Sequence, residues 1–100
     1  MSNLVKAIGI PAMLEQTAEE ASELAFACLK LARMLRNENK VYGRSKEELV
    51  ENLNEEIADI TICFQEMLMS NIVSEKSIAN MIELKCERMK HRLEEDLRHG

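Results

Sequence analysis

The sequence predicts an all-α protein, an antiparallel helical bundle of three main helices. Leu, Ala, Glu, Lys, Arg and Met, the strong helix formers, are abundant among the 100 residues. Gly (3), Pro (1) and aromatic residues (3%) are too scarce for a many-turned β-sandwich or barrel. Apolar residues recur at helical spacing in three long stretches with no linker between them. We therefore expect one domain spanning residues 1–100, in which short connections make neighbouring helices antiparallel.

The first predicted helix runs from Ala12 to about Asn37. Pro11 fits its first turn, because the N–H that proline lacks has no intrahelical acceptor there. Gly9 separates this helix from a short leading segment, Asn3–Ile8. The predicted apolar face of the helix comprises Leu14, Ala18, Ala21, Leu24, Ala25, Cys28, Leu31, Ala32 and Leu35.

The second predicted helix follows a polar stretch, Asn37–Arg44, whose composition is typical of a loop. Ser45 and Glu48 have the spacing of a capping box, so the helix begins at this point. Its predicted apolar face comprises Leu49, Val50, Leu53, Ile57, Ile60, Phe64, Met67 and Leu68. Phe64 is accordingly expected in the core.

The third predicted helix is capped by Ser74 and runs to about His99. We expect it to bury Ile78, Ile82, Cys86, Met89 and Leu93. A second apolar side of the preceding helix comprises Ala58, Ile62 and Met69. Because a helix that is apolar on two sides usually meets two neighbours, we expect a homo-oligomer in which a second subunit completes a four-helix core.

Composition and charge exclude several classes of protein. The net charge of −5 argues against a protein that coats a nucleic acid polymer, because phosphate binding usually needs a basic surface. No apolar run reaches the roughly 18 residues of a membrane span, and Met1–Ile10 is too short and too weakly basic for a secretory signal. The three cysteines lack C-x-x-C spacing and lie in apolar helical patterns. Reduced thiols in a cytoplasmic protein are therefore expected, rather than disulfides or a zinc site.

Carboxylates occupy matching stripes on the first two helices, at successive spacings of 4, 3, 4 and 3 residues along the border of each apolar face. The first stripe comprises Gln16, Glu20, Glu23, Ala27 and Lys30, and the second comprises Asn52, Glu56, Asp59, Cys63 and Glu66. Antiparallel packing of these helices would bring four carboxylates together: Glu20, Glu23, Glu56 and Asp59.

Four converging carboxylates would repel one another strongly. A hard divalent cation relieves this repulsion, and Mg²⁺, with Mn²⁺ as a substitute, takes oxygen ligands while keeping positions for water and phosphate. Either acidic pair alone is typical of a solvated surface, because Glu is the commonest polar helix former. Two pairs on matching borders favour a metal site.

A basic stripe on the third helix comprises Lys85, Arg88 and Arg92. Taken alone, it is more simply interpreted as salt bridging to Glu residues of a neighbouring helix. Facing a carboxylate–metal centre, it would instead neutralise the outer charges of a polyphosphate. Lys30, on the first acidic stripe, fits either role.

Two of these motifs resemble a known family. The run Gln16–Leu24, followed by Lys30, resembles the first signature of the MazG-like all-α nucleoside triphosphate pyrophosphohydrolases, and Glu55–Ile60 resembles the second. The family pattern is E-x-x-E, a spacer and E-x-x-D. The matching residues are Glu20, Glu23, Glu56 and Asp59.

The resemblance covers about residues 10–93, and the basic third helix, from Lys85 onward, is similar more loosely. One departure is the spacer between the two acidic motifs, residues 24–55, which is longer than is usual for the family. The excess falls around Arg36–Arg44.

The resemblance implies Mg²⁺-dependent cleavage between the α- and β-phosphates of a nucleoside triphosphate, releasing a nucleoside monophosphate and pyrophosphate. It also implies a dimer or a dimer of dimers. Either Glu20 or Glu23 would take the proton of the attacking water. The candidate substrate-binding residues are Lys30, Lys85 and Arg88 for the outer phosphates, and Gln16 and Asn52 for the sugar or base.

Two alternatives stay open at this point. A related phosphoanhydride hydrolase, such as a phosphoribosyl-ATP pyrophosphatase, would share the metal site. A non-catalytic helical-bundle adaptor or regulatory protein would keep the apolar stripes without any need for the carboxylates to converge. Their geometry therefore separates an enzyme from an adaptor.

Overall fold

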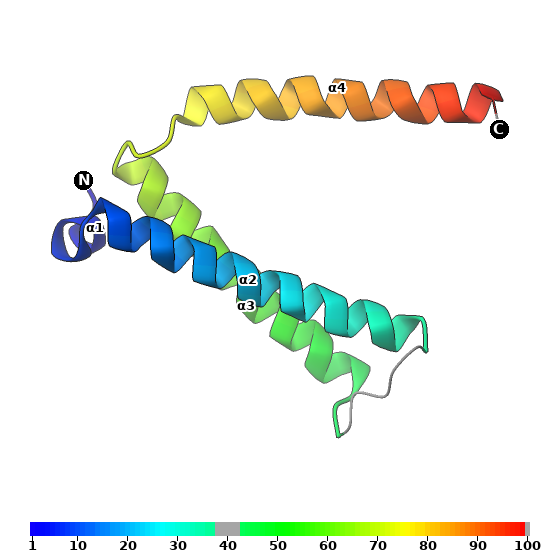
Figure 1. Ribbon diagram of the computed structural model, residues 1–100, viewed down its shortest axis with the longest axis horizontal. Coiled ribbons are helices and arrows are strands. Elements are labelled where there is room, and N and C mark those ends of the chain that lie inside the picture. The colour runs from blue at the N-terminus through cyan, green and yellow to red at the C-terminus, as the bar shows by residue number, and fades with distance from the viewer. Residues whose placement is uncertain (38–42, 100) are drawn as a thin grey trace.

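The computed structural model describes residues 1–37 and 43–99, and within these ranges every regular element is an α-helix. The helices are α1 (Asn3–Ile8), α2 (Ile10–Leu35), α3 (Lys46–Met69) and α4 (Glu75–His99) (Figure 1). The all-α prediction is confirmed, and each of the three long predicted helices is present. Among the described residues, no helix combines the length and the apolar character needed to cross a membrane.

The chain begins with two helices joined at a sharp corner. The Ser2 hydroxyl caps α1 by accepting a hydrogen bond from the Val5 N–H (3.1 Å). Gly9 then adopts φ 88°, in a region that side chains rarely enter, and this conformation turns the chain from α1 into α2. Pro11 lies in the first turn of α2, as predicted.

The start of α3 also follows the local sequence. The Ser45 hydroxyl accepts a hydrogen bond from the Glu48 N–H (3.1 Å), which confirms the predicted cap. The Glu48 carboxylate lies 3.3 Å from that hydroxyl. Residues 38–42 lie outside the described part of the chain. They fall in the predicted loop Asn37–Arg44, where the extra length of the spacer is also placed.

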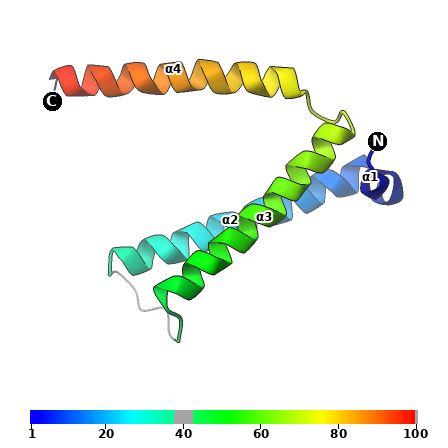
Figure 2. The same cartoon turned by 180° about the vertical axis from the view of Figure 1, so that it is seen from behind.

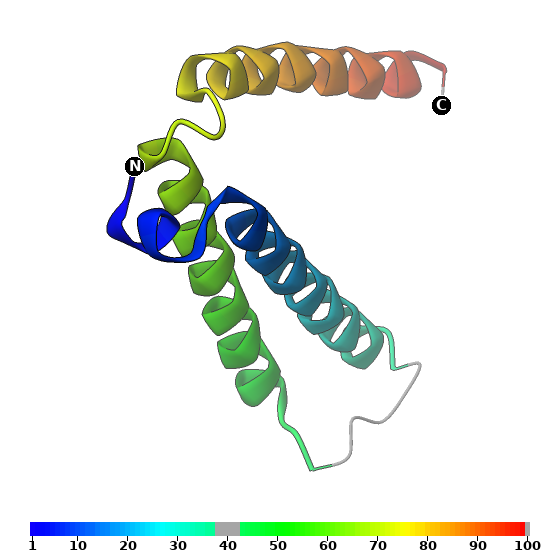
Figure 3. The same ribbon diagram turned by 60° about the vertical axis from the view of Figure 1, so that its left-hand side comes forward.

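α2 and α3 pack side by side in antiparallel directions and form the core of the molecule (Figures 1 and 3). The buried core cluster comprises Val5, Met13, Ile60, Cys63 and Met67. Val5 brings α1 into this cluster, and it is only 1% exposed. Further along the pair, Ala27 and Leu49 are also buried.

α2 meets α3 along a seam that differs from its predicted apolar face. The seam residues of α2 are buried or half-buried and recur every three or four positions, as in a helix–helix contact: Met13, Thr17, Glu20, Leu24, Ala27, Leu31 and Met34. Of the other predicted positions, Ala32 is half-buried and six are exposed: Leu14, Ala18, Ala21, Ala25, Cys28 and Leu35. That prediction was wrong because α2 is apolar on two sides, and periodicity alone does not say which side packs within the chain.

The seam of α3 agrees better than that of α2 with the apolar face predicted from the sequence. It comprises Leu49, Leu53, Glu56, Ile60, Cys63 and Met67. The expectation for Phe64 was wrong, because its side chain is 50% exposed on the flank of the pair.

α3 ends in a turn that sends α4 away from its own α2–α3 pair (Figures 1 and 2). The Ile72 N–H donates to the Met67 carbonyl (3.0 Å) and the Asn71 N–H to the Leu68 carbonyl (3.2 Å), while Asn71 adopts φ 56°. These bonds form a Schellman motif. Ser74 then caps α4 by accepting from the Ser77 N–H (3.2 Å), as predicted.

α4 buries none of its 25 residues, so the predicted burial of its apolar stripe was wrong within one chain. The residues concerned, all exposed, are Ile78, Ile82, Cys86, Met89 and Leu93. The three main helices therefore do not form a closed bundle by themselves. The physical reason is the turn at Asn71, where the chain leaves α3 and α4 starts in a direction away from the pair.

Candidate metal centre

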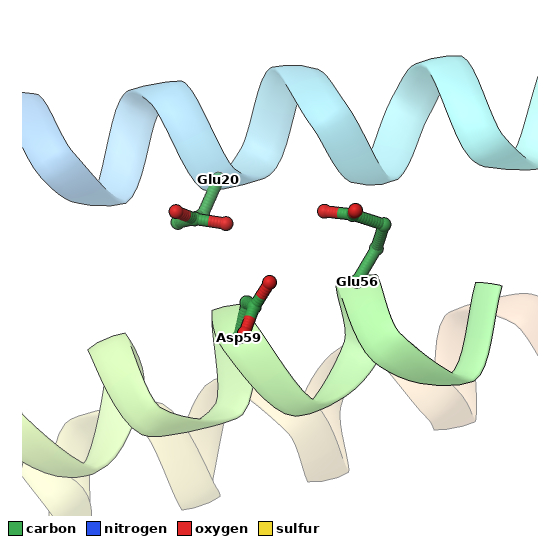
Figure 4. A group of neighbouring side chains, drawn as sticks. All are labelled: Glu20, Glu56 and Asp59. Carbon is green, nitrogen blue, oxygen red and sulfur yellow. The ribbon is translucent and has the colours of Figure 1, made fainter. Parts of the chain in front are cut away.

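Three of the four predicted carboxylates converge between α2 and α3 (Figure 4). Oxygen atoms of Glu20, Glu56 and Asp59 all lie within 4.8 Å of one another. Glu20 projects from α2, whereas Glu56 and Asp59 project from successive turns of α3 and face it. Three carboxylates at this spacing form an oxygen donor set of the kind that hard divalent cations prefer.

The convergence follows from the positions of the two glutamates in the seam. Glu20 and Glu56 occupy seam positions at which a helix pair ordinarily places an apolar side chain. Both are half-buried, and in each the Oε2 atom is buried without a hydrogen-bond partner among the described residues. The other Glu20 oxygen accepts a hydrogen bond from the Gln16 amide (2.9 Å). Unpartnered buried carboxylate oxygens are costly, and a bound cation would satisfy them.

Electrostatic repulsion acts on the whole cluster. Partial burial and then the charges of Glu23 and Asp59 raise the pKa of Glu20 above its ordinary value. The pKa of Glu56 is raised by the same causes in the same order, and also by a hydrogen bond with Glu23. Both carboxylates therefore hold protons more tightly in the folded protein than in an unfolded chain.

Glu23 lies at the side of the three-carboxylate cluster, next to Glu56. Both line a hollow of about 390 Å³, together with Ser22, Phe26, Lys30 and Asn52. Two predicted substrate-binding residues, Lys30 and Asn52, thus lie beside the carboxylates. The Lys30 ammonium sits 4.5 Å from the centre of the Phe26 ring.

Sequence reasoning missed Phe26 as part of this site. Its ring is 58% exposed, although it lies in the hollow beside Glu23 and Lys30. The signal was present, because Phe26 follows Glu23 by three residues and precedes Lys30 by four, and this spacing puts all three on one face of α2.

A second hollow, of about 310 Å³, opens on the other side of the cluster. Gln16, Glu20 and Asp59 form its polar edge. Its other lining residues are apolar or weakly polar: Leu4, Ile8, Met13, Ile62 and Cys63. The third predicted substrate-binding residue of the α2–α3 pair, Gln16, thus borders a different hollow from Lys30 and Asn52.

Lys85 and Arg88 lie on α4 and are not brought to the carboxylates within the chain. Together with Met89 and Arg92 they line a shallow depression on the exposed surface of α4. Within residues 1–37 and 43–99, none of these three basic side chains forms an ion pair, so the salt bridges considered from the sequence are not formed inside one chain.

No family model matches this chain, and neither the curated proteins nor the solved structures contain a match to it.

The raised pKa values predict how pH and Mg²⁺ affect stability. The folded chain binds protons more tightly at Glu20 and Glu56, so their contribution to stability is fully present below the unfolded value, 4.5. It is lost as pH rises through the raised pKa. A cation that binds the ionised cluster stabilises the folded state. We expect Mg²⁺ to raise the melting temperature more near pH 8 than near pH 5, as measured by differential scanning calorimetry. Equal shifts at both pH values would contradict the assignment.

Proposed function

We propose that this protein hydrolyses a nucleoside triphosphate, standard or modified, to a nucleoside monophosphate and pyrophosphate in the presence of Mg²⁺. The observation that carries the proposal is the convergence of carboxylate oxygens from Glu20, Glu56 and Asp59 within 4.8 Å. It is supported by the buried, unpartnered oxygens of both glutamates, which a bound cation would satisfy. The family resemblance of the two acidic motifs points to the same chemistry.

The donor set fits Mg²⁺, because all three side chains offer carboxylate oxygens. Glu20, Glu56 and Asp59 would hold the cation, with Glu23 at the flank. When bound, Mg²⁺ supplies positive charge to phosphate oxygens and makes water a stronger acid.

Glu23 is the better placed general base of the two candidates. It stands outside the three-carboxylate cluster and faces the hollow that also contains Lys30. In the proposed reaction a water attacks the α-phosphorus while Glu23 accepts its proton, and the bond to the bridging oxygen breaks to release pyrophosphate. The Lys30 ammonium contacts the departing phosphates, and the Asn52 amide bonds the sugar or base.

The proposal includes a homo-oligomer whose second subunit completes a four-helix core. The apolar side chains left exposed on α2, α3 and α4 support it, because an isolated soluble chain rarely exposes so much apolar surface. The proposed setting is the cytoplasm, which is consistent with the free thiols of Cys28, Cys63 and Cys86.

Phe26 is expected to stack against the nucleobase, because its exposed ring lines the hollow beside Lys30. Stacking of one base on an aromatic ring contributes about 1–3 kcal/mol, so Phe26→Leu should raise KM about 5- to 150-fold. Phe26→Tyr keeps the aromatic face and should leave KM close to that of the wild type. Steady-state kinetics on the preferred nucleotide measure both variants, and an unchanged KM in Phe26→Leu would remove Phe26 from the site.

The proposal is tested by measuring pyrophosphate and nucleoside monophosphate released from a panel of standard and modified nucleoside triphosphates. The expected result is Mg²⁺-dependent release of both products in equal amounts from at least one nucleotide, and its loss in EDTA. The panel includes phosphoribosyl-ATP, so that it also distinguishes a phosphoribosyl-ATP pyrophosphatase from a nucleoside triphosphate pyrophosphohydrolase. Release of inorganic phosphate alone, or no release from any substrate, would overturn the proposal.

A non-catalytic adaptor is the second candidate, and the exposed apolar stripe of α4 favours it. An adaptor does not need the three carboxylates to bind a cation. Isothermal titration with Mg²⁺ and Mn²⁺ therefore separates the two candidates without an activity assay. Absence of cation binding together with an inactive nucleotide panel would favour the adaptor.

A further inference from the structure

α4 is an amphipathic helix that its own chain leaves uncovered. Glu95 is half-buried, and every other residue of α4 is exposed. The large apolar side chains concerned are Ile78, Met81, Ile82, Leu84, Met89, Leu93 and Leu97, with exposed fractions from 40% to 85%. Soluble monomers rarely leave an apolar stripe of this length uncovered, and such a stripe is typical of an interaction surface.

The chain exposes more surface than a compact monomer of its mass, and the excess has the size of a subunit interface. The chain exposes 7898 Å², whereas a compact monomer of 11.5 kDa exposes about 5800 Å². The difference, roughly 2100 Å², exceeds the roughly 800 Å² that each partner buries in an interface of standard size. Its size is instead that of the larger interfaces between obligate subunits.

The basic stripe of α4 and the carboxylate cluster between α2 and α3 carry opposite charges. Residues 1–74 contain 7 Lys and Arg against 12 Asp and Glu, so they hold the whole net charge of −5, while α4 contains six of each. On α4, Lys85, Arg88 and Arg92 form one basic stripe without ion-pair partners among the described residues. The carboxylates between α2 and α3 have no cationic partner in that part of the chain either.

The turn before α4 indicates that α4 packs against a second copy of the chain rather than folding back onto its own α2–α3 pair. Ser70 is 8% exposed, and its hydroxyl accepts a hydrogen bond from the Ser2 N–H (2.9 Å). Ile72 and Val73 pack against the core cluster. With Asn71 held at φ 56°, these contacts fix the start of α4 in a direction away from its own pair. The three long helices have similar lengths, 26, 24 and 25 residues, so α4 can cover a neighbouring pair from end to end.

We propose that two copies of this chain exchange α4, so that each α4 lies along the α2–α3 pair of the partner subunit and places its basic stripe beside the partner's carboxylate cluster. Reciprocal exchange closes the assembly with two-fold symmetry and leaves no unpaired α4. Each site then takes its carboxylates from one chain and Lys85, Arg88 and Arg92 from the other. The contact of these cations with substrate phosphates rests on the proposed function, whereas the exchange of α4 does not.

Mixed dimers test the composite site. One variant is Asp59→Asn, and the other combines Lys85→Ala, Arg88→Ala and Arg92→Ala; each alone should lose most of its activity. Refolded together in equal amounts, they should recover about a quarter of wild-type activity, because half of the dimers are mixed and each mixed dimer has one intact site. No recovery, or full activity of the triple variant alone, would overturn the proposal.

A matched control places all four substitutions in one chain and refolds it with wild type. If the cations come from the partner subunit, only wild-type homodimers have intact sites, and activity should be about a quarter of the maximum. If the cations came from the same chain, half of the activity would survive. A quarter of the maximum activity therefore indicates cations from the partner subunit, and half indicates cations from the same chain. Both outcomes are measured on the same quadruple variant.

A second test needs no catalytic activity and stands even if the nucleotide panel is negative. Chains labelled with ¹⁴N and ¹⁵N are refolded together and treated with a carbodiimide, which joins the Lys85 ammonium to nearby carboxylates. About half of the peptides linking Lys85 to Glu20, Glu23, Glu56 or Asp59 should pair the two isotopes, as random exchange requires. The exchange would be overturned if every such link joined two peptides of the same isotope. It would also be overturned if light scattering found a monomer and no such links formed.

Discussion

Replacing Asp59 by Asn should lower kcat/KM by about 100- to 1000-fold, the effect expected when one charged group that stabilises the transition state is removed. Asn preserves the shape of the side chain and removes its charge, so one of the three converging oxygen donors becomes a much weaker ligand. The same change should raise the melting temperature without Mg²⁺ near pH 8, because the Asp59 charge raises the pKa of both Glu20 and Glu56.

Glu55→Gln is the matched control for this experiment. Glu55 lies on the same helix and carries the same charge as its neighbour Glu56, but it is exposed and stands outside the carboxylate cluster. Its replacement should leave kcat/KM within a factor of about two, as for most surface substitutions. Wild-type activity in Asp59→Asn, with folding intact by circular dichroism, would contradict the metal assignment.

Replacing Met13 by Ala should lower the free energy of unfolding by about 2–5 kcal/mol, as in other truncations of a buried side chain. Met13 is 1% exposed and belongs to the core cluster where α1, α2 and α3 meet. A loss of this size is a large part of the total stability of a small domain, about 5–15 kcal/mol. Urea denaturation followed by circular dichroism at fixed protein concentration measures it.

Met13→Leu keeps most of the buried volume and should cost less than about 1.5 kcal/mol. The same loss in both variants would contradict a packed core at this position and indicate a specific role for the sulfur. Because Met13 also lines the hollow that Gln16 and Asp59 border, comparing the two variants separates loss of stability from change at the site.

The boundaries of the helices were predictable because the signals that set them are local. Ser45 and Ser74 cap α3 and α4 through bonds to N–H groups three residues later, and such bonds depend only on nearby sequence. The pairing of Glu56 with Asp59 on one face of α3 is also local, since it follows from helical spacing.

The packing face of α2 was not predictable in this way. Most of the predicted apolar face, including Leu14 and Cys28, stays exposed, and the seam also includes Thr17 and Glu20. A glutamate in the seam of a helix pair opposes burial, so periodicity assigned Glu20 to the border. Contacts with α3 outweigh that local preference, and they bring Glu20 opposite Glu56 and Asp59.

The sequence by itself determined that the chain is helical, where its long helices begin and which carboxylates share a helix face. Those properties depend on interactions within a few residues, which the order of amino acids specifies directly. Only the tertiary structure decided that three carboxylates meet while Glu23 stands beside them, and that α4 leaves its own pair. These outcomes depend on which of several apolar faces pack together and on contacts that hold the turn at Asn71, such as the hydrogen bond from Ser2 to Ser70. Both bring together residues that are distant in the sequence.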